Sequence, residues 1–431
     1  MKKISIFIII FILMYGFIYA GDHQGKYVIK NATIVTVTGP IIEKGAVIID
    51  GNKITYVGRF PSIPEGAEVI DAEGLYVYPG MINSYTTLGL TEIGSVRETN
   101  DAREVGDFNT FIKASSAINP SSVHIPITRV NGITTALTVP QGSLICGYGA
   151  LINLYGWTIE EMILEDKAVM VVNFPRSTPF AYFREPTKEE KKKAAEKAKK
   201  QIEKMENLFE KARLYYKAKK SYEAGELKTP PPVDMTLDAL IPVIKGEVPL
   251  LIGVSNEKDI KEAVKFVNNV KVKAIFTGVN DGWKVADLLA KNKIPCLVGS
   301  VLSVPGNKDP FDAGYANAGI LNKAGVKIAF VTGGASDARN LPYHAGMSAA
   351  YGLPRDEALK AVTIYPAQIF GVDDKIGSIE VGKIANIVVT DDDILEMRTH
   401  IKYLFINGKN VPLKSKHTEL YEKYKKKYGI K

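Results

Sequence analysis

Short apolar runs alternate with segments of helical periodicity between residues 168 and 332, and this alternation restricts the fold more than any other feature. The runs, each six or seven residues long, are AVMVVNF (168–174), PLLIGV (249–254), KVKAIF (271–276), IPCLVG (294–299) and KIAFVT (327–332). Segments between them, such as EKDIKEAVKFV, place apolar residues three and four apart. Such alternation is typical of parallel strands, and its length predicts an α/β fold built on a (β/α)8 TIM-type barrel. An open doubly wound sheet is the alternative, although no GxGxxG or phosphate-loop string follows these runs.

Both ends of the chain carry a different pattern, one of short β-branched segments separated by turns. Residues 27–78 contain GAVIIDGNKITYVGR, with an Asp-Gly-Asn turn, and residues 372–412 contain GKIANIVVTD and YLFINGKNV, with an Asn-Gly turn. We therefore expect the two segments to complete one small β-sandwich domain, with the barrel of residues 79–371 inserted between them.

Two further segments are dense in charge. Residues 185–226 are rich in Lys and Glu, with apolar residues at helical spacing, and predict a long amphipathic helix inserted in the barrel domain. Docking on the barrel, a lid over its mouth and a dimer arm are the alternatives for this helix. The basic C-terminal tail, residues 413–431, interleaves Tyr with Lys, as in a solvated helix or a contact with an acidic surface.

The first 20 residues have the layout of a secretory signal peptide. Lys2 and Lys3 precede an apolar run of residues 4–18, and the small residues Ala20 and Gly21 follow. The run is shorter than the ~20 residues that a bilayer span requires. We expect cleavage after Ala20, with an uncleaved anchor as the alternative, and an exported protein, periplasmic or extracellular, with no membrane span after cleavage.

The net charge of +8 does not indicate a nucleic-acid-binding face. The two leader lysines supply +2 and residues 413–431 supply +5, which leaves the body of the chain near +1. The two cysteines, Cys146 and Cys296, lie in apolar runs and are expected to be buried free thiols rather than a disulfide.

Three strings resemble the amidohydrolase superfamily, in its imidazolonepropionase-like branch. They are IDAEGLYVYPGMINSYTTLGL (70–90), GVSNEKDIKEAVKFV continuing to TGVNDGWKVADLLAKNKIPCLVGS (253–300), and LKAVTIYPAQIFGVDDKIGSIEVGKIANIVVTD (359–391). The resemblance implies a barrel with a composite small domain and hydrolysis of non-peptide C–N bonds in amides or imides. It also implies a divalent metal such as zinc at the barrel mouth, held by His residues and an Asp.

The sequence departs from this pattern at each ligand position. Tyr85 and Thr87 stand where the first strand would carry its two His, Gly253 and Gly278 where later strands would carry theirs, and Gly333 where the last strand would carry its Asp. Glycine offers no ligand atom, and neutral hydroxyls bind divalent transition metals poorly. We therefore expect no metal and no other cofactor. The histidines beyond the leader region are His124, His344, His400 and His417.

Polar residues remain at the expected barrel mouth. Asp337 and His344 follow the last strand and are candidates for an acid/base pair, with a structural His as the alternative. The substrate-binding candidates are the mouth positions Tyr85, Thr87, Gly253, Gly278, Gly333 and Arg339. The loop at residues 92–107 has several carboxylates and arginines, which predict an ordering Arg–carboxylate network or a paired-carboxylate site. Ser143 and Ser300 lie outside any nucleophile-elbow motif.

Two hypotheses follow for function. The first is an exported amidohydrolase-like enzyme that lacks the usual metal set. The second is a pseudoenzyme whose barrel binds a small-molecule ligand or a protein partner, as a homo-oligomer or paired with a catalytically complete relative. We expect no nucleic-acid partner in either case.

Overall fold

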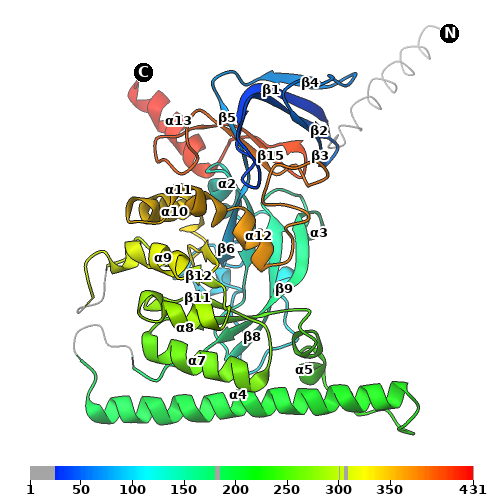
Figure 1. Ribbon diagram of the computed structural model, residues 1–431, viewed down its shortest axis with the longest axis vertical. Coiled ribbons are helices and arrows are strands. Elements are labelled where there is room, and N and C mark those ends of the chain that lie inside the picture. The colour runs from blue at the N-terminus through cyan, green and yellow to red at the C-terminus, as the bar shows by residue number, and fades with distance from the viewer. Residues whose placement is uncertain (1–24, 180–184, 300, 305–308, 431) are drawn as a thin grey trace, which may run out of the picture.

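The structure is a computed structural model that describes residues 25–179, 185–299, 301–304 and 309–430. A small sheet domain adjoins a barrel, and a long helix, α4 (Lys188–Glu223), crosses the end of the barrel away from the sheet (Figure 1). The predicted signal peptide, residues 1–20, and Ser300 lie outside the described residues. The fold class expected from the sequence is confirmed.

The small domain joins both ends of the chain in one sheet. Its strand order is β16-β15-β14-β5-β1-β2-β3, with β4 also paired to β1, and the junction is the antiparallel pairing of β14 with β5. Core residues from β3 (Ile54) and β15 (Phe405) belong to one apolar cluster, so the predicted sandwich is a single sheet curled around its own core. The strands are β1 (Lys26–Ile34), β2 (Ile42–Asp50), β3 (Lys53–Gly58), β4 (Glu68–Asp71), β5 (Tyr76–Pro79), β14 (Ile387–Thr390), β15 (Ile401–Ile406) and β16 (Lys409–Asn410).

The barrel is formed by the next eight strands in chain order. The Gly333 amide donates to the Tyr85 carbonyl at 3.2 Å, and a parallel bridge joins Thr86 to Gly333, which brings the first and last strands together. Every apolar run at residues 168–332 overlaps one of these strands. The strands are β6 (Met81–Thr86), β7 (Ile133–Thr138), β8 (Ile145–Asn153), β9 (Ile163–Asn173), β10 (Leu250–Val254), β11 (Ala274–Gly278), β12 (Cys296–Val298) and β13 (Ile328–Phe330).

One barrel strand departs from the expected parallel arrangement. β8 pairs antiparallel with both β7 and β9, whereas the other neighbouring pairs are parallel. The connection from β7 to β8 spans only residues 139–144, and a parallel crossover needs a dozen or more residues. The chain therefore turns back directly and forms a hairpin at this point of the barrel.

Helices cover the outside of the barrel, and a separate apolar cluster fills its inside. Leu251 of β10 and Ile275 of β11 belong to the inner cluster, and their sequence neighbours Ile252 and Phe276 belong to the outer one, as strand alternation requires. The shorter helices are α2 (His124–Arg129), α3 (Ile159–Met162), α5 (Met235–Asp238), α6 (Ile241–Ile244), α7 (Glu257–Val270), α8 (Ala286–Lys291), α9 (Ala313–Lys323), α10 (Leu341–Ala350), α11 (Arg355–Lys360) and α12 (Ile364–Ile369). The 3-10 turns of the described residues are η1 (Arg97–Thr99), η2 (Ala114–Ser116), η3 (Gly282–Lys284) and η4 (Ala338–Asn340).

The charged insertion forms α4 (Lys188–Glu223). This helix begins with a capping box formed by Thr187 and Glu190. Its apolar stripe docks on the barrel helices, with Phe209 edge-on to Phe266 of α7 at 6.0 Å between ring centroids. Of the three alternatives for this segment, docking is the arrangement in the structure. The basic tail forms α13 (Lys416–Tyr428).

Cys146 and Cys296 are both free and buried, as predicted. Burial raises the pKa of the Cys146 thiol to about 12 and raises that of Cys296 as well. Among the described residues, no helix combines the length and the apolar composition that a membrane span requires.

Candidate functional site

A cavity of about 740 Å³ opens at the C-terminal mouth of the barrel, where β9, β10 and β11 end. Strand register places Asn173, Gly253 and Thr277 side by side, each two residues beyond an apolar residue of the inner cluster. Because side chains alternate along a strand, these three positions face into the barrel above its apolar filling. Polar residues thus begin where the packed core ends, and the missing side chain of Gly253 leaves room between its neighbours.

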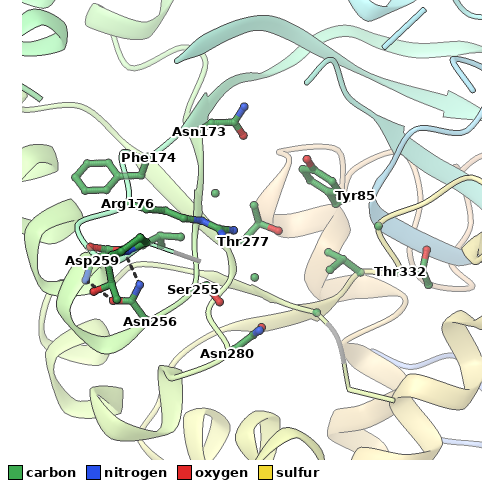
Figure 2. Close-up of a pocket in the computed structure, with 18 residues that line it drawn as sticks. Tyr85, Asn173, Phe174, Arg176, Ser255, Asn256, Asp259, Thr277, Asn280 and Thr332 are labelled. Carbon is green, nitrogen blue, oxygen red and sulfur yellow. Dashed lines mark hydrogen bonds between the residues drawn. The ribbon is translucent and has the colours of Figure 1, made fainter. Parts of the chain in front are cut away.

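Arg176 supplies a positive charge at this cavity. It lies in the loop that leaves β9, and Figure 2 shows its side chain extending over the cavity in the direction of Thr277. The side chain is exposed, and no carboxylate among the described residues forms an ion pair with it. Its guanidinium is therefore free to bind an anion that enters the mouth.

Asp259, in the first turn of α7, is the cavity's carboxylate, and its oxygens are already engaged. One oxygen accepts from the Ser177 amide at 3.0 Å and the Ser177 hydroxyl at 2.6 Å, and the other accepts from the Asn256 side-chain amide at 2.5 Å. The Asp259 side chain is buried. These bonds tie the loop that carries Arg176 to the N-terminal turn of α7, so Asp259 orders the site.

Two hydroxyl groups also line the cavity. Thr277 is 7% exposed, and its hydroxyl has no hydrogen-bond partner among the described residues. The Tyr85 hydroxyl accepts a long hydrogen bond of 3.5 Å from the Gln141 side-chain amide, and burial raises the pKa of Tyr85. Both hydroxyls are neutral near pH 7 and available to donate to a ligand.

The structure brings together four of the predicted substrate-binding residues and separates the others. Tyr85, Gly253, Gly278 and Gly333 line the cavity. Gly278 and Gly333 have φ of +90° and +82°, a conformation that favours glycine, so their place at the mouth also has a backbone cause. Thr87 and Arg339 do not line this cavity. Thr87 is buried beyond the end of β6, and the Arg339 side chain donates to the Ser336 carbonyl.

The predicted acid/base candidates also lie away from the cavity lining. Asp337 precedes η4 and is exposed, whereas His344 is buried in α10 with an Nδ1 atom that lacks a partner. Burial lowers the pKa of His344 to about 4, although the charge of Asp337 acts in the opposite direction. A buried imidazole that is neutral at pH 7 agrees with the structural alternative for this residue.

Backbone hydrogen bonds hold the loop at residues 92–107, where the sequence predicted an Arg–carboxylate network. The Glu92 amide donates to the Thr99 carbonyl at 3.0 Å, and the Asp101 amide donates to the Leu90 carbonyl at 2.8 Å. The loop's ion pair runs outward, from Asp107 to Lys204 of α4 at 3.6 Å. Within the described part of the chain, no ion pair joins a loop arginine to a loop carboxylate.

No group of three or more His, Cys, Asp or Glu side chains is placed to hold a metal ion in the part of the chain that the structure describes. The groups at the strand ends are an amide, hydroxyls and glycines. In the sequence, positions 180–184, 300, 305–308 and 431, which the structure does not describe, contain none of these four residue types, and positions 1–24 contain Asp22 and His23.

Sequence reasoning missed Arg176, Asn173 and Asp259. Arg176 follows a predicted strand within NFPRSTP, and a charged residue just beyond the C-terminal end of a barrel strand was the available signal. That it lacks a carboxylate partner, and that Asp259 has several donors, follows only from the tertiary contacts.

Comparisons with known proteins find similarity to amidohydrolases in sequence and in fold. A family model described as "Amidohydrolase family" matches residues 257–411. The fold is similar to an amidohydrolase from Thermotoga maritima, with a TM-score of 0.78 and 24% identity over 90% of this chain and 100% of that chain. The 5-methylthioadenosine/S-adenosylhomocysteine deaminase of Bacillus thuringiensis is 24% identical over 88% of this chain and 92% of that protein.

Two other relatives match a shorter segment of this chain at higher sequence identity. The D-hydantoinase of Geobacillus stearothermophilus is 49% identical over 79 residues, which are 18% of this chain and 16% of that protein. The deaminase of Moorella thermoacetica is 38% identical over 75 residues, which are 17% of this chain and 18% of that protein. The chain thus matches less than a fifth of the length of these two relatives.

Proposed function

We propose that this chain, which is similar to amidohydrolases in sequence and fold, is an exported protein that binds a small carboxylate-bearing molecule at its barrel mouth without a metal ion. The observation that carries the proposal is the guanidinium of Arg176, unpaired with any described carboxylate and extended over the cavity. Guanidinium binds carboxylate through two parallel hydrogen bonds, a geometry that few other side chains offer.

The remaining lining suits a small organic anion. The volume of about 740 Å³ falls in the range of small-molecule sites. The free hydroxyl of Thr277 and the hydroxyl of Tyr85 supply further donors. Asp259 adds little repulsion because three donors already share its charge.

The groups at the strand ends do not fit the divalent metal that the superfamily implies. The side chains of Tyr85 and Thr87 end in neutral hydroxyls, and Gly253, Gly278 and Gly333 carry no donor atom. Zinc in proteins is held by thiolate, imidazole and carboxylate. We therefore derive no metal-assisted hydrolysis for this chain and assign the mouth a binding role, the second of the two hypotheses from the sequence.

Export rests on the leader, with its two lysines, apolar run and small residues near position 20. Expression in a two-membrane bacterium, followed by N-terminal sequencing of the periplasmic fraction, tests it. A mature N-terminus at Gly21 is the expected result, and cytoplasmic full-length chain would contradict export.

The competing hypothesis is that the barrel is an enzyme. It is favoured by the names of its relatives, among them a hydantoinase and deaminases. Metal analysis of protein purified without chelator, with a panel of cyclic imides, lactams and dipeptides, separates the two. We expect substoichiometric metal and no turnover. One bound metal per chain together with hydrolysis of any panel member would refute the metal-free binding role.

Calorimetric titration with N-acetylglycine tests the role of Arg176, with the neutral N-acetylglycinamide as its comparison. Arg176→Gln should raise the Kd for the carboxylate at least tenfold, because a hydrogen bond to a charged group contributes about 1.5–3 kcal/mol. The matched control is Arg398→Gln, at an exposed arginine remote from the cavity lining. It should leave the Kd unchanged. Equal binding of acid and amide by the parent chain, or equal Kd values in both variants, would contradict the proposal.

A further inference from the structure

α13 is a well-formed helix that buries none of its residues. A capping box of Ser415 and Thr418 starts it, and Gly429, with φ +64°, ends it. Its N-terminal end packs beside α2, and the rest lies at the periphery of the molecule near the C-terminus (Figure 1). The helix is therefore ordered by its own caps and leaves nearly its whole surface to solvent.

The exposed apolar side chains of α13 are not scattered around it. At about 100° per residue they fall within one arc of about 100°. This arc, the tyrosine face, comprises Leu420, Tyr421, Tyr424 and Tyr428. Tyr421 is 63% exposed and Tyr428 is 66% exposed. A solitary exposed aromatic residue is ordinary, but three on one side of an unburied helix form a surface that is suited to a partner.

Charge is sorted around the same helix. By the same geometry, Lys416, Lys423 and Lys427 border one edge of the tyrosine face and Lys425 borders the other. Glu419, Glu422 and Lys426 project from the opposite side of the helix. The Lys427 ammonium lies 5.3 Å from the Tyr428 ring centre, so cations do lie against the tyrosine face. No ion pair joins any α13 lysine to a carboxylate in the described part of the chain.

We infer that the tyrosine face and its bordering lysines dock on an anionic lipid surface. Basic helices with one apolar side lie in the membrane interface, where lysines meet anionic headgroups and tyrosine rings sit at headgroup depth. The +5 charge of residues 413–431 contrasts with a near-neutral body, so the attraction is local to this end of the chain. An exposed helix at the molecular edge presents a convex surface, which a flat bilayer can meet. This inference does not depend on the role proposed for the barrel mouth.

Vesicle sedimentation tests the inference. Chains that begin at Gly21, so that the leader contributes nothing, are mixed with phosphatidylcholine vesicles and with vesicles in which part of the lipid is anionic phosphatidylglycerol. The parent chain should bind the anionic vesicles at least tenfold more tightly than the neutral ones, and high salt should weaken that binding. Lys423→Glu with Lys427→Glu should reduce it at least tenfold.

The control pair Lys192→Glu with Lys200→Glu makes the same change in net charge on the exposed side of α4. It should bind as the parent does, which separates a local docking surface from general electrostatic attraction. Tyr424→Ser with Tyr428→Ser should also weaken binding, and thermal melting verifies that each variant is folded. Equal binding to both vesicle types, binding to neither, or equal loss in both lysine pairs would overturn the inference. Binding to neither would leave an acidic protein as the partner to seek.

Discussion

Asp259→Ala should be one of the most destabilising single changes near the barrel mouth. The side chain is buried and accepts three hydrogen bonds, two of them from Ser177, which is itself only 8% exposed. Removing a buried acceptor leaves its donors desolvated and unpaired, at a cost of about 1–3 kcal/mol for each poorly hydrated group. Since water can reach Asn256 but hardly Ser177, we expect a loss of about 3 kcal/mol in the free energy of unfolding.

Urea unfolding followed by fluorescence measures this loss. The matched control is Asp287→Ala, which removes an exposed aspartate from the first turn of α8 and should cost no more than about 1 kcal/mol. Because Asp259 ties down the loop that carries Arg176, Asp259→Ala should also weaken N-acetylglycine binding in protein that remains folded. Equal stability of the two variants would refute the view that this carboxylate orders the mouth.

Two further predictions concern a titrating group and a backbone position. Burial lowers the pKa of His344 to about 4 in the folded chain. As pH falls from about 6.5 to 4, His344 therefore takes up a proton in the unfolded chain but not in the folded chain, and the free energy of unfolding falls by about 3 kcal/mol. His344→Gln should lack this part of the loss when urea unfolding is compared at pH 7.5 and pH 4.5, and an identical pH dependence would contradict the buried neutral state. Gly408 has φ +76°, and a Cβ there would lie 1.9 Å from the Gly51 carbonyl oxygen, where the two ends of the small sheet meet. Gly408→Ala should therefore lower the melting temperature far more than Gly225→Ala, which has a similar φ but open space, and equal shifts would argue against this close approach.

The sequence predicted the barrel because each parallel strand leaves a strong local signal, an apolar run followed by an amphipathic helix. It did not predict the reversed direction of β8, since strand direction depends on the length of the connection and both directions place apolar side chains alike. The joining of the two chain ends in one sheet, through β5 and β14, was predictable because both end segments carry short β-branched runs separated by turns.

The candidate site was predictable only in part. Tyr85, Gly253, Gly278 and Gly333 follow from where strands end, a property of the local sequence. Arg176 matters because no described carboxylate pairs with it, and the absence of an ion pair is a property of the tertiary structure. The arginines of the loop at residues 92–107 lie close in sequence to carboxylates, yet they form no ion pairs with them among the described residues. Proximity in sequence therefore did not predict these contacts.

The most direct test of the central claim is the Kd for N-acetylglycine measured on one preparation in two states, after dialysis against EDTA and after addition of one equivalent of zinc. Binding through Arg176 and the neutral groups of the mouth predicts the same Kd in both states. Binding that disappears with EDTA and returns with zinc would show that a metal ion holds the carboxylate, and would contradict the account.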